Sequence, residues 1–170
     1  MTVNLTFQNP GSKEFEIVSE SGPSVVRQKV LRRMVDSEAA ASRDDSLRLN
    51  QFTPANYDFQ LLRLEPIEGR MAYVLEVFPK TKSPYLMRGE VWVDTEDFAI
   101  SRLVGRPAQS PSFWIPDSRF TCSYSKLGSF WLLASMDSEA DVRVFGHTEM
   151  QIRYRNYRIN LEQEAVSADR

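Results

Sequence analysis

From residue 57 onward the chain alternates short apolar-rich segments with turn-forming stretches, a pattern that few folds satisfy. The segments are YDFQLLRL, MAYVLEVF, YLMRGEVWVD, FAISRLVG, SRFTCSYSK, FWLLASMD, ADVRVFG and EMQIRYRNYRI. Between them lie Pro-, Gly- or Asp-containing stretches such as EPIEGR, PKTKSP and DTED, which favour turns. Strands of this length and spacing predict an antiparallel meander, as in a β-barrel or a β-sandwich.

Several of these segments are apolar on both faces. In MAYVLEVF the alternate positions from Met71 to Val77 are apolar, and so are Ala72, Val74 and Phe78 on the opposite face. YLMRGEVWV and FWLL show a similar pattern. An antiparallel sheet with one solvated face should instead alternate cleanly between apolar and polar residues. We therefore expect part of the second face to be covered by a helix, a partner or an apolar ligand.

The sequence before residue 57 predicts two further elements. Residues 3–18 predict a hairpin with Pro10-Gly11 in its turn. Residues 24–41 predict an amphipathic helix, because Ser24 can cap it and apolar residues then recur at helical spacing. We expect residues 1–160 to form a single domain and residues 161–170 to be a frayed tail.

Charge and cysteine content narrow the classes of function. The formal net charge of -2 argues against a nucleic-acid-binding protein. RYRNYR at 153–158 has the mixture of Arg and Tyr found in stacking platforms for single strands, but the charge balance favours a solvated outer strand. Cys122 is the single cysteine, so an intrachain disulfide is excluded. It alternates with Phe120 and Tyr124, which favours an inward structural thiol.

The N-terminal sequence and the hydropathy of the chain indicate where in the cell the protein is located. No apolar run approaches the roughly 20 residues that span a bilayer. The N-terminus lacks the basic segment and apolar core of a signal peptide. Taken alone, these features indicate a cytoplasmic protein, with a missing leader or N-terminal segment as the alternative.

Asp94, Glu96 and Asp97 form the densest acidic cluster of the sequence. Such carboxylates can perform acid–base chemistry or hold calcium, but acidic residues after a strand are also ordinary turn formers. His147 is the single histidine, and it has no nucleophile elbow or set of metal ligands beside it. We therefore interpret DTED as a hairpin turn and expect no catalytic residue, metal or cofactor. An enzyme using these carboxylates and His147 stays as an alternative.

Three stretches carry a resemblance to a known family. They are NYDFQLLRLEPIEGRMAYVLEVFPKTKSPYLMRGEVWVD, RGEVWVDTEDFAISRLVGRPAQSPSFW and FWLLASMDSEADVRVFGHTEMQIRYRNYRI. Together they resemble the bacterial outer-membrane lipoprotein-sorting proteins, the LolA/LolB-like superfamily, over about residues 14–160. The resemblance implies a mainly β (α+β) fold, a curved, unclosed antiparallel half-barrel of about 8–10 strands. The helix at 24–41 would pack on its concave face. The family's usual N-terminal part, which carries its lipid-hook residues, is expected to be missing here.

The resemblance also implies a function. The chain would be a non-catalytic lipid- or lipoprotein-binding protein of the bacterial cell envelope, a carrier or sensor that is periplasmic or associated with the outer membrane. Acyl chains of a lipid or an acylated lipoprotein would lie in a hydrophobic cavity between half-barrel and helix. The candidate lining residues are Met87, Trp92, Phe98, Ile100, Phe113, Trp114, Phe130 and Trp131. The alternative is a structural or interaction module that pairs through its open sheet, for example as a homodimer.

Overall fold

The structure is a computed structural model that describes residues 2–8, 12–19, 51–110, 112–113, 115–143 and 146–159, the first two ranges as backbone only. Its first two strands, β1 (Thr2–Gln8) and β2 (Ser12–Ser19), pair antiparallel as a two-stranded sheet. This confirms the hairpin predicted for residues 3–18.

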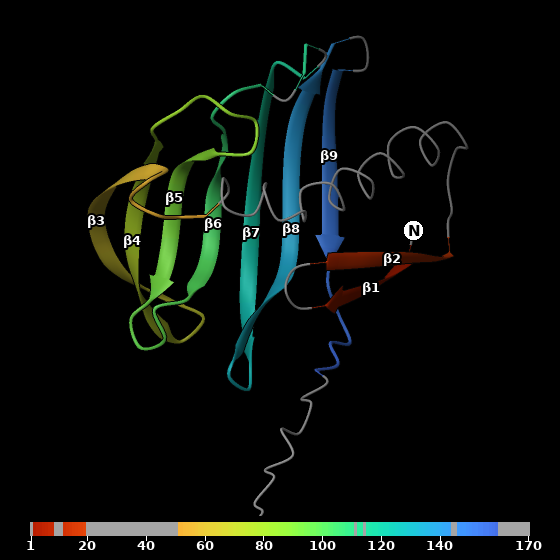
Figure 1. Cartoon of the computed structure of the whole chain (residues 1–170), viewed down its shortest axis with the longest axis horizontal. Coiled ribbons are helices and arrows are strands. Elements are labelled where there is room, and N and C mark those ends of the chain that lie inside the picture. Colours follow the sequence, from red (N-terminus) through yellow and green to blue (C-terminus); the bar gives the residue numbers. More distant parts are fainter. Residues whose placement is uncertain are drawn as a thin grey trace, which may run out of the picture.

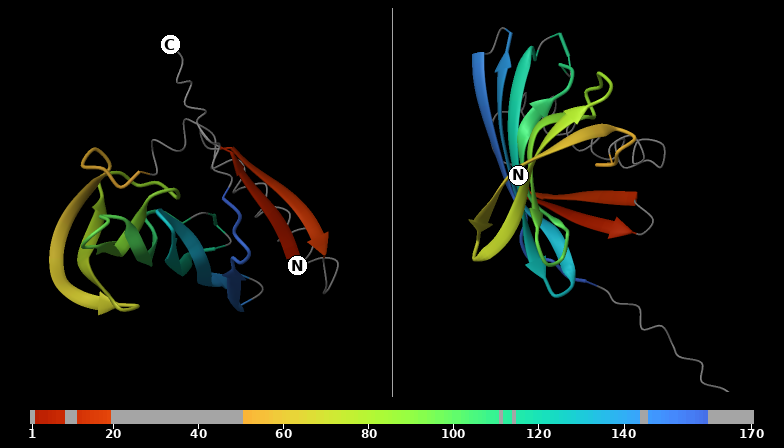
Figure 2. Two further views of the ribbon diagram at one scale, coloured as in Figure 1. Left: turned by 90° about the horizontal axis from the view of Figure 1, so that it is seen from below. Right: turned by 90° about the vertical axis from the view of Figure 1, so that its left-hand side faces the viewer.

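The other strands form one antiparallel sheet of seven strands, in which each strand pairs with the next one along the chain. Figure 1 shows them side by side from β3 to β9. The two edge strands lie far apart, so the sheet is open, and Figure 2 shows that it is strongly twisted. The strands are β3 (Tyr57–Ile67), β4 (Arg70–Pro79), β5 (Met87–Asp94), β6 (Ile100–Pro107), β7 (Asp117–Leu127), β8 (Phe130–Val142) and β9 (Gly146–Arg153).

The predicted fold class is wrong. A half-barrel of about 8–10 strands with a helix on its concave face was expected, whereas the described residues form a seven-stranded open sheet and a separate two-stranded sheet, with no helix. The predicted helix at 24–41 and the tail at 161–170 lie outside the described residues. One cause of the wrong strand count is β8, in which FWLLASMD and ADVRVFG form a single strand of 13 residues. Its polar residues Asp137, Glu139 and Asp141 resembled a break, but they alternate along one face of the sheet.

The two faces of the seven-stranded sheet differ in character. On one face, the strand register aligns an apolar residue from every strand. This row is Leu61, Leu75, Val91, Leu103, Cys122, Met136 and Ile152. We call this side the apolar face. The opposite side, the polar face, carries rows such as Arg63, Val74, Trp92, Arg102, Ser123, Ser135 and Arg153.

The larger buried cluster lies on the apolar face. Val77, Val91, Leu103 and Cys122 are buried there, with Leu86 packed against the same cluster from the β4–β5 connection. Tyr57 anchors one end, because its ring stacks on Phe52 with centroids 5.0 Å apart. Its hydroxyl accepts a hydrogen bond of 3.1 Å from the backbone N–H of Met87. A smaller cluster of Ala72, Val74 and Trp92 lies on the polar face, so strands β4 and β5 are buried on both sides.

Candidate functional site

The apolar face becomes exposed toward the edge of the sheet formed by β3 and β4. Four large apolar side chains there are substantially open to solvent: Phe59 at 40%, Leu61 at 59%, Leu64 at 56% and Met71 at 45%. We call these four residues the edge patch. It continues the apolar row, because Leu61 pairs with Leu75, and Leu75 pairs with the buried Val91. The edge patch is therefore the solvent-exposed end of the apolar face, which is buried in the middle strands of the sheet.

A bulge in β3 keeps the edge patch on one face. The register shifts between Leu61 and Arg63, so Leu62 is an extra residue. Without it, the regular alternation of a strand would place Leu64 opposite to Leu61. With it, Leu61 pairs with Leu75 and Leu64 pairs with Tyr73, both on the apolar face. Strong local twist and an extra residue are typical of such bulges at sheet edges.

Two residues predicted to line a cavity lie on opposite sides of the sheet. Met87 is buried in the larger cluster of the apolar face, and Trp92 is buried in the smaller cluster of the polar face. They are five positions apart on one strand, and side chains an odd number of positions apart point to opposite faces. The structure therefore does not bring these two together in one cavity.

The remaining predicted lining residues are also spread over the molecule. Ile100 and Trp131 are half-buried at strand ends, whereas Phe98 and Phe113 are 73% and 69% exposed in connections. Phe130 is 41% exposed at the start of β8. Trp114 lies outside the described residues. Sequence reasoning missed the edge patch, although the alternation of Phe59 and Leu61 in YDFQLLRL was a visible signal.

The acidic cluster forms the turn between β5 and β6, built around a buried carboxylate. Asp94 is 1% exposed. Arg70 donates two hydrogen bonds to it, of 2.6 Å from Nε to Oδ2 and 2.8 Å from Nη2 to Oδ1. The backbone N–H groups of Glu96 and Asp97 donate to the same Oδ1 at 3.0 and 2.8 Å. These hydrogen bonds, above all those from Arg70, hold the pKa of Asp94 well below its usual range.

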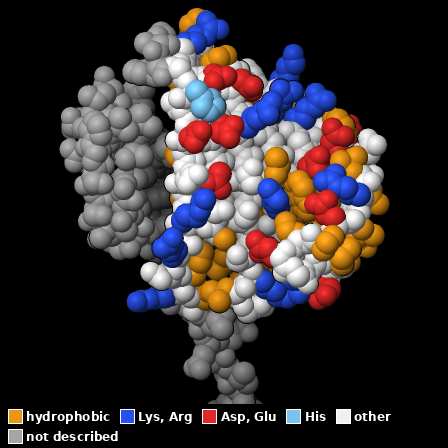
Figure 3. All heavy atoms as spheres, turned by 180° about the vertical axis from the view of Figure 1, so that it is seen from behind, with side chains coloured by type: hydrophobic (Ala, Val, Ile, Leu, Met, Phe, Trp, Pro, Cys, Tyr) orange, Lys and Arg blue, Asp and Glu red, His pale blue; other side chains and the backbone are white. Residues whose placement is uncertain are grey.

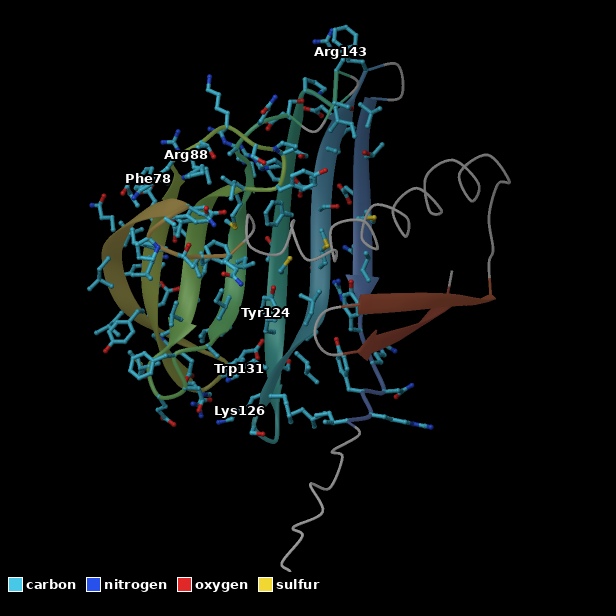
Figure 4. The ribbon with its side chains drawn as sticks, in the orientation of Figure 1. Phe78, Arg88, Tyr124, Lys126, Trp131 and Arg143 are labelled. Carbon is cyan, nitrogen blue, oxygen red and sulfur yellow. The ribbon has the colours of Figure 1, made fainter. Side chains whose placement is uncertain are left out.

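Asp97 joins this turn to the β7–β8 hairpin. Its Oδ2 lies 2.7 Å from Nζ of Lys126 and accepts a hydrogen bond of 3.0 Å from Nε1 of Trp131. The guanidinium of Arg70 lies 5.9 Å from the ring centroid of the same tryptophan, a cation–π arrangement. Figure 4 shows Trp131 and Lys126 near the lower end of β7 and β8. The acidic residues thus connect two hairpins, and the hydrogen bonds from Lys126 and Trp131 lower the pKa of Asp97.

His147 stands apart from this turn. It is exposed near the start of β9, where its Nδ1 lies 3.1 Å from Oδ1 of Asp141. The hydrogen bond to Asp141 raises the pKa of the imidazole. β9 begins at the end of the sheet opposite to the β5–β6 turn (Figure 1). The structure therefore does not bring His147 together with Asp94, Glu96 and Asp97.

Two further observations concern chemistry at other sites. Cys122 is buried in the larger cluster. Within the residues that the structure describes, no group of three or more His, Cys, Asp or Glu side chains could hold a metal ion.

The same residues contain no helix that is long and apolar enough to cross a membrane.

On the polar face, charged side chains surround the buried ring of Trp92. Its Nε1 donates a hydrogen bond of 2.5 Å to Glu65, and this bond is the main cause that lowers the pKa of the glutamate. The guanidinium groups of Arg63 and Arg102 lie 5.8 and 5.3 Å from the tryptophan ring centroid. Arg63 also pairs with Glu65 and Glu90 at 2.7 and 2.9 Å. Polar partners therefore surround this tryptophan, and it does not extend the edge patch.

Comparison of the chain with protein family models, characterised proteins and solved structures finds no match.

Proposed function

We propose that this chain is a non-catalytic binding protein of the bacterial cell envelope that holds a lipid or an acylated lipoprotein through the edge patch. One observation carries the proposal: Phe59, Leu61, Leu64 and Met71 are exposed together on one face of β3 and β4. Scattered apolar side chains are normal on a protein surface, whereas a contiguous group marks a site of interaction. The resemblance of the strand sequences to lipoprotein-sorting proteins supports the same class of ligand.

The physical properties of this surface suit an acyl chain. Its exposed residues are aliphatic or aromatic, and the apolar row leads from Leu61 through Leu75 to the buried centre of the sheet. Burying a hydrocarbon chain gains about 0.8 kcal/mol per methylene. A fatty chain can therefore bind by apolar contact alone, once the cost of ordering it is met.

A fluorescent fatty-acid analogue tests this proposal. Titrated into the full chain, it should bind and be displaced by an unlabelled fatty acid. Leu61→Glu places a charge in the edge patch and should weaken binding about tenfold. Leu127→Glu is the matched control, because Leu127 is 46% exposed at the end of β7, and it should leave binding unchanged. An absence of displaceable binding, or an equal loss in both variants, would contradict the proposal.

A second function is favoured by a different observation. β3 is 11 residues long and, among the strands that the structure describes, it pairs only with β4, which makes it an edge strand. An open, apolar edge strand is a template for pairing with another chain. On this view the edge patch would be covered by a second copy of the chain or by a partner's strand.

Light scattering over a range of protein concentrations separates the two functions. Edge pairing predicts a dimer that forms as the concentration rises and that Leu61→Glu disrupts. If the chain binds lipid instead, its mass should stay constant as the protein concentration rises, and Leu61→Glu should lose the bound lipid. A constant monomer mass would remove the pairing function.

A further inference from the structure

The polar face contains a hollow of about 510 Å³ over strands β5 to β9. Its lining comes from two neighbouring rows of that face. One row comprises Val104, Thr121, Asp137 and Gln151, and the other comprises Arg119, Glu139 and Glu149, with Arg106 of β6 also in the lining. Between them, Gly105 and Phe120 contribute from a row whose side chains belong to the apolar face. The hollow is therefore on the side of the sheet opposite to the edge patch.

Charges in this hollow are segregated by strand. Arg88 pairs with Arg106 across β5 and β6, and Arg119 precedes Phe120, which pairs with Gly105 of β6. Arg119 pairs with Glu139, which pairs with Glu149. The order across five strands is thus three arginines followed by two glutamates. Figure 3 shows this side of the molecule, where acidic side chains surround the histidine and a group of basic side chains lies beside them.

Arg119 stands opposite Glu139 in the register, but among the described residues the two side chains form no close ion pair. Within the described part of the chain, Arg106, Arg119 and Glu139 take part in no ion pair. Arg88 lies over the ring of Phe78, 5.5 Å from its centroid, rather than against a carboxylate (Figure 4). Like charges directly opposite each other destabilise a sheet. Three adjacent arginines therefore leave an anion-binding capacity that the described residues do not use.

We infer that the hollow binds a small zwitterion, with an oxyanion against Arg106 and Arg119 and an ammonium group against Glu139. Guanidinium groups bind phosphate and carboxylate oxygens with paired, charge-assisted hydrogen bonds. Neighbouring strands lie about 4.8 Å apart, and this is close to the span between phosphate and amine in a phosphoethanolamine group. A hollow of about 510 Å³ is within the range of small-molecule sites. The site is independent of the edge patch and of the function proposed for it.

Calorimetric titration of the full chain with three probes tests the inference. Phosphoethanolamine carries both charges, inorganic phosphate carries only the anion, and ethanolamine carries only the cation. Phosphoethanolamine should bind more tightly than either of the other two, and added salt should weaken it. Equal affinity for phosphoethanolamine and phosphate would overturn the zwitterion assignment. No binding of any probe would overturn the site.

Three variants assign the charges, with a fourth as control. Arg119→Gln should weaken phosphoethanolamine binding about tenfold, and Arg106→Gln should act in the same direction. Glu139→Gln should weaken phosphoethanolamine binding but strengthen phosphate binding, because it removes an ammonium partner and a repulsive charge at once. Lys82→Gln removes one positive charge from an exposed loop and should change neither affinity. If Glu139→Gln strengthens both ligands, the hollow is a plain anion site and the inference fails.

Vesicles distinguish a free solute from a lipid headgroup. Vesicles of phosphatidylethanolamine with phosphatidylcholine should retain the chain, and Arg119→Gln should release it, if the zwitterion is presented by a membrane. Binding of free phosphoethanolamine without vesicle retention assigns a soluble ligand to the same site. Circular dichroism of each variant checks that the fold is kept, so a loss of binding can be read as a loss of contact.

Discussion

Asp94 shows how one side chain can determine the structure of a turn. Its carboxylate is 1% exposed and is satisfied by Arg70 and by two backbone N–H groups of its own turn. The sequence correctly predicted that DTED is a turn, because acidic residues follow a strand there. It did not reveal Arg70, which is 24 positions away and is brought alongside by the pairing of β4 with β5. A contact that depends on strand register cannot be read from local pattern.

We predict that Asp94→Asn lowers the free energy of unfolding by about 1–3 kcal/mol. The amide keeps the shape of the side chain but loses the charge that receives the two hydrogen bonds from Arg70. Urea denaturation followed by circular dichroism measures the change. Glu96→Gln is the control, because the Glu96 side chain is 73% exposed and surface pairs contribute little. Equal effects in the two variants would contradict this role of Asp94.

The same carboxylate should make stability depend on pH. The pKa of Asp94 is lower in the folded chain than its ordinary value of 3.8, so the unfolded chain takes up a proton first as the pH falls. The contribution of Asp94 is therefore complete above about pH 5 and is lost progressively below it. The difference in unfolding free energy between the wild type and Asp94→Asn should shrink as the pH is lowered from 4 to 2. A difference that stays constant would be the contrary result.

His147 allows a second pH titration, and because it is the single histidine of the chain, its imidazole signal is unambiguous. Its hydrogen bond to Asp141 raises the imidazole pKa above its ordinary value of 6.5. The stabilising effect is complete below pH 6.5 and is lost as the pH rises through the folded pKa. A titration by nuclear magnetic resonance should place the pKa above 6.5, and Asp141→Asn should lower it. An unchanged midpoint in the variant would show that Asp141 is not the cause.

At the scale of the strand, β5 and β6 approach each other closely through a pair of glycines. Gly89 pairs with Gly105, and a Cβ atom on Gly89 would lie 2.1 Å from the carbonyl oxygen of Val104. Gly89→Ala should therefore cost about 2 kcal/mol or more, because backbone must move to admit the methyl group. Gly128→Ala is the comparison: its φ of +62° strains an alanine, but nothing lies within 4 Å, and the cost should be about 1 kcal/mol. Both glycines have a positive φ, +155° at Gly89, so a larger loss of stability for Gly89→Ala in thermal unfolding reports the close approach, and equal losses would contradict it.

β3 and β8 show where sequence pattern succeeds and fails for an element. YDFQLLRL was predicted as a strand because its apolar residues alternate, and β3 covers that segment. The bulge at Leu62, which returns Leu64 to the same face as Leu61, could not be predicted because it depends on pairing with β4. In β8 the segments FWLLASMD and ADVRVFG were expected as two separate strands. They form one strand whose acidic residues Asp137, Glu139 and Asp141 are on the polar face, opposite to Met136.

At the scale of the molecule, the sheet separates two kinds of surface. The apolar row and the edge patch occupy one face, and the segregated charges occupy the other. Apolar residues on both sides of β4 and β5 were predicted from sequence, and the two buried clusters confirm them. The predicted lining residues do not form one cavity, because some of them, such as Met87 and Trp92, lie on opposite faces of the sheet. A sequence gives the parity of side chains along one strand, but not which face of the sheet is left open.

Mass spectrometry tests the proposed binding of lipid by the edge patch most directly. The mass of the intact full chain would be measured under native conditions, and an organic extract of the same preparation would be analysed for lipids. The proposal predicts a fatty acid or phospholipid in stoichiometric amount, bound to a monomer and lost in Leu61→Glu. A lipid-free protein, whether monomer or dimer, would contradict it.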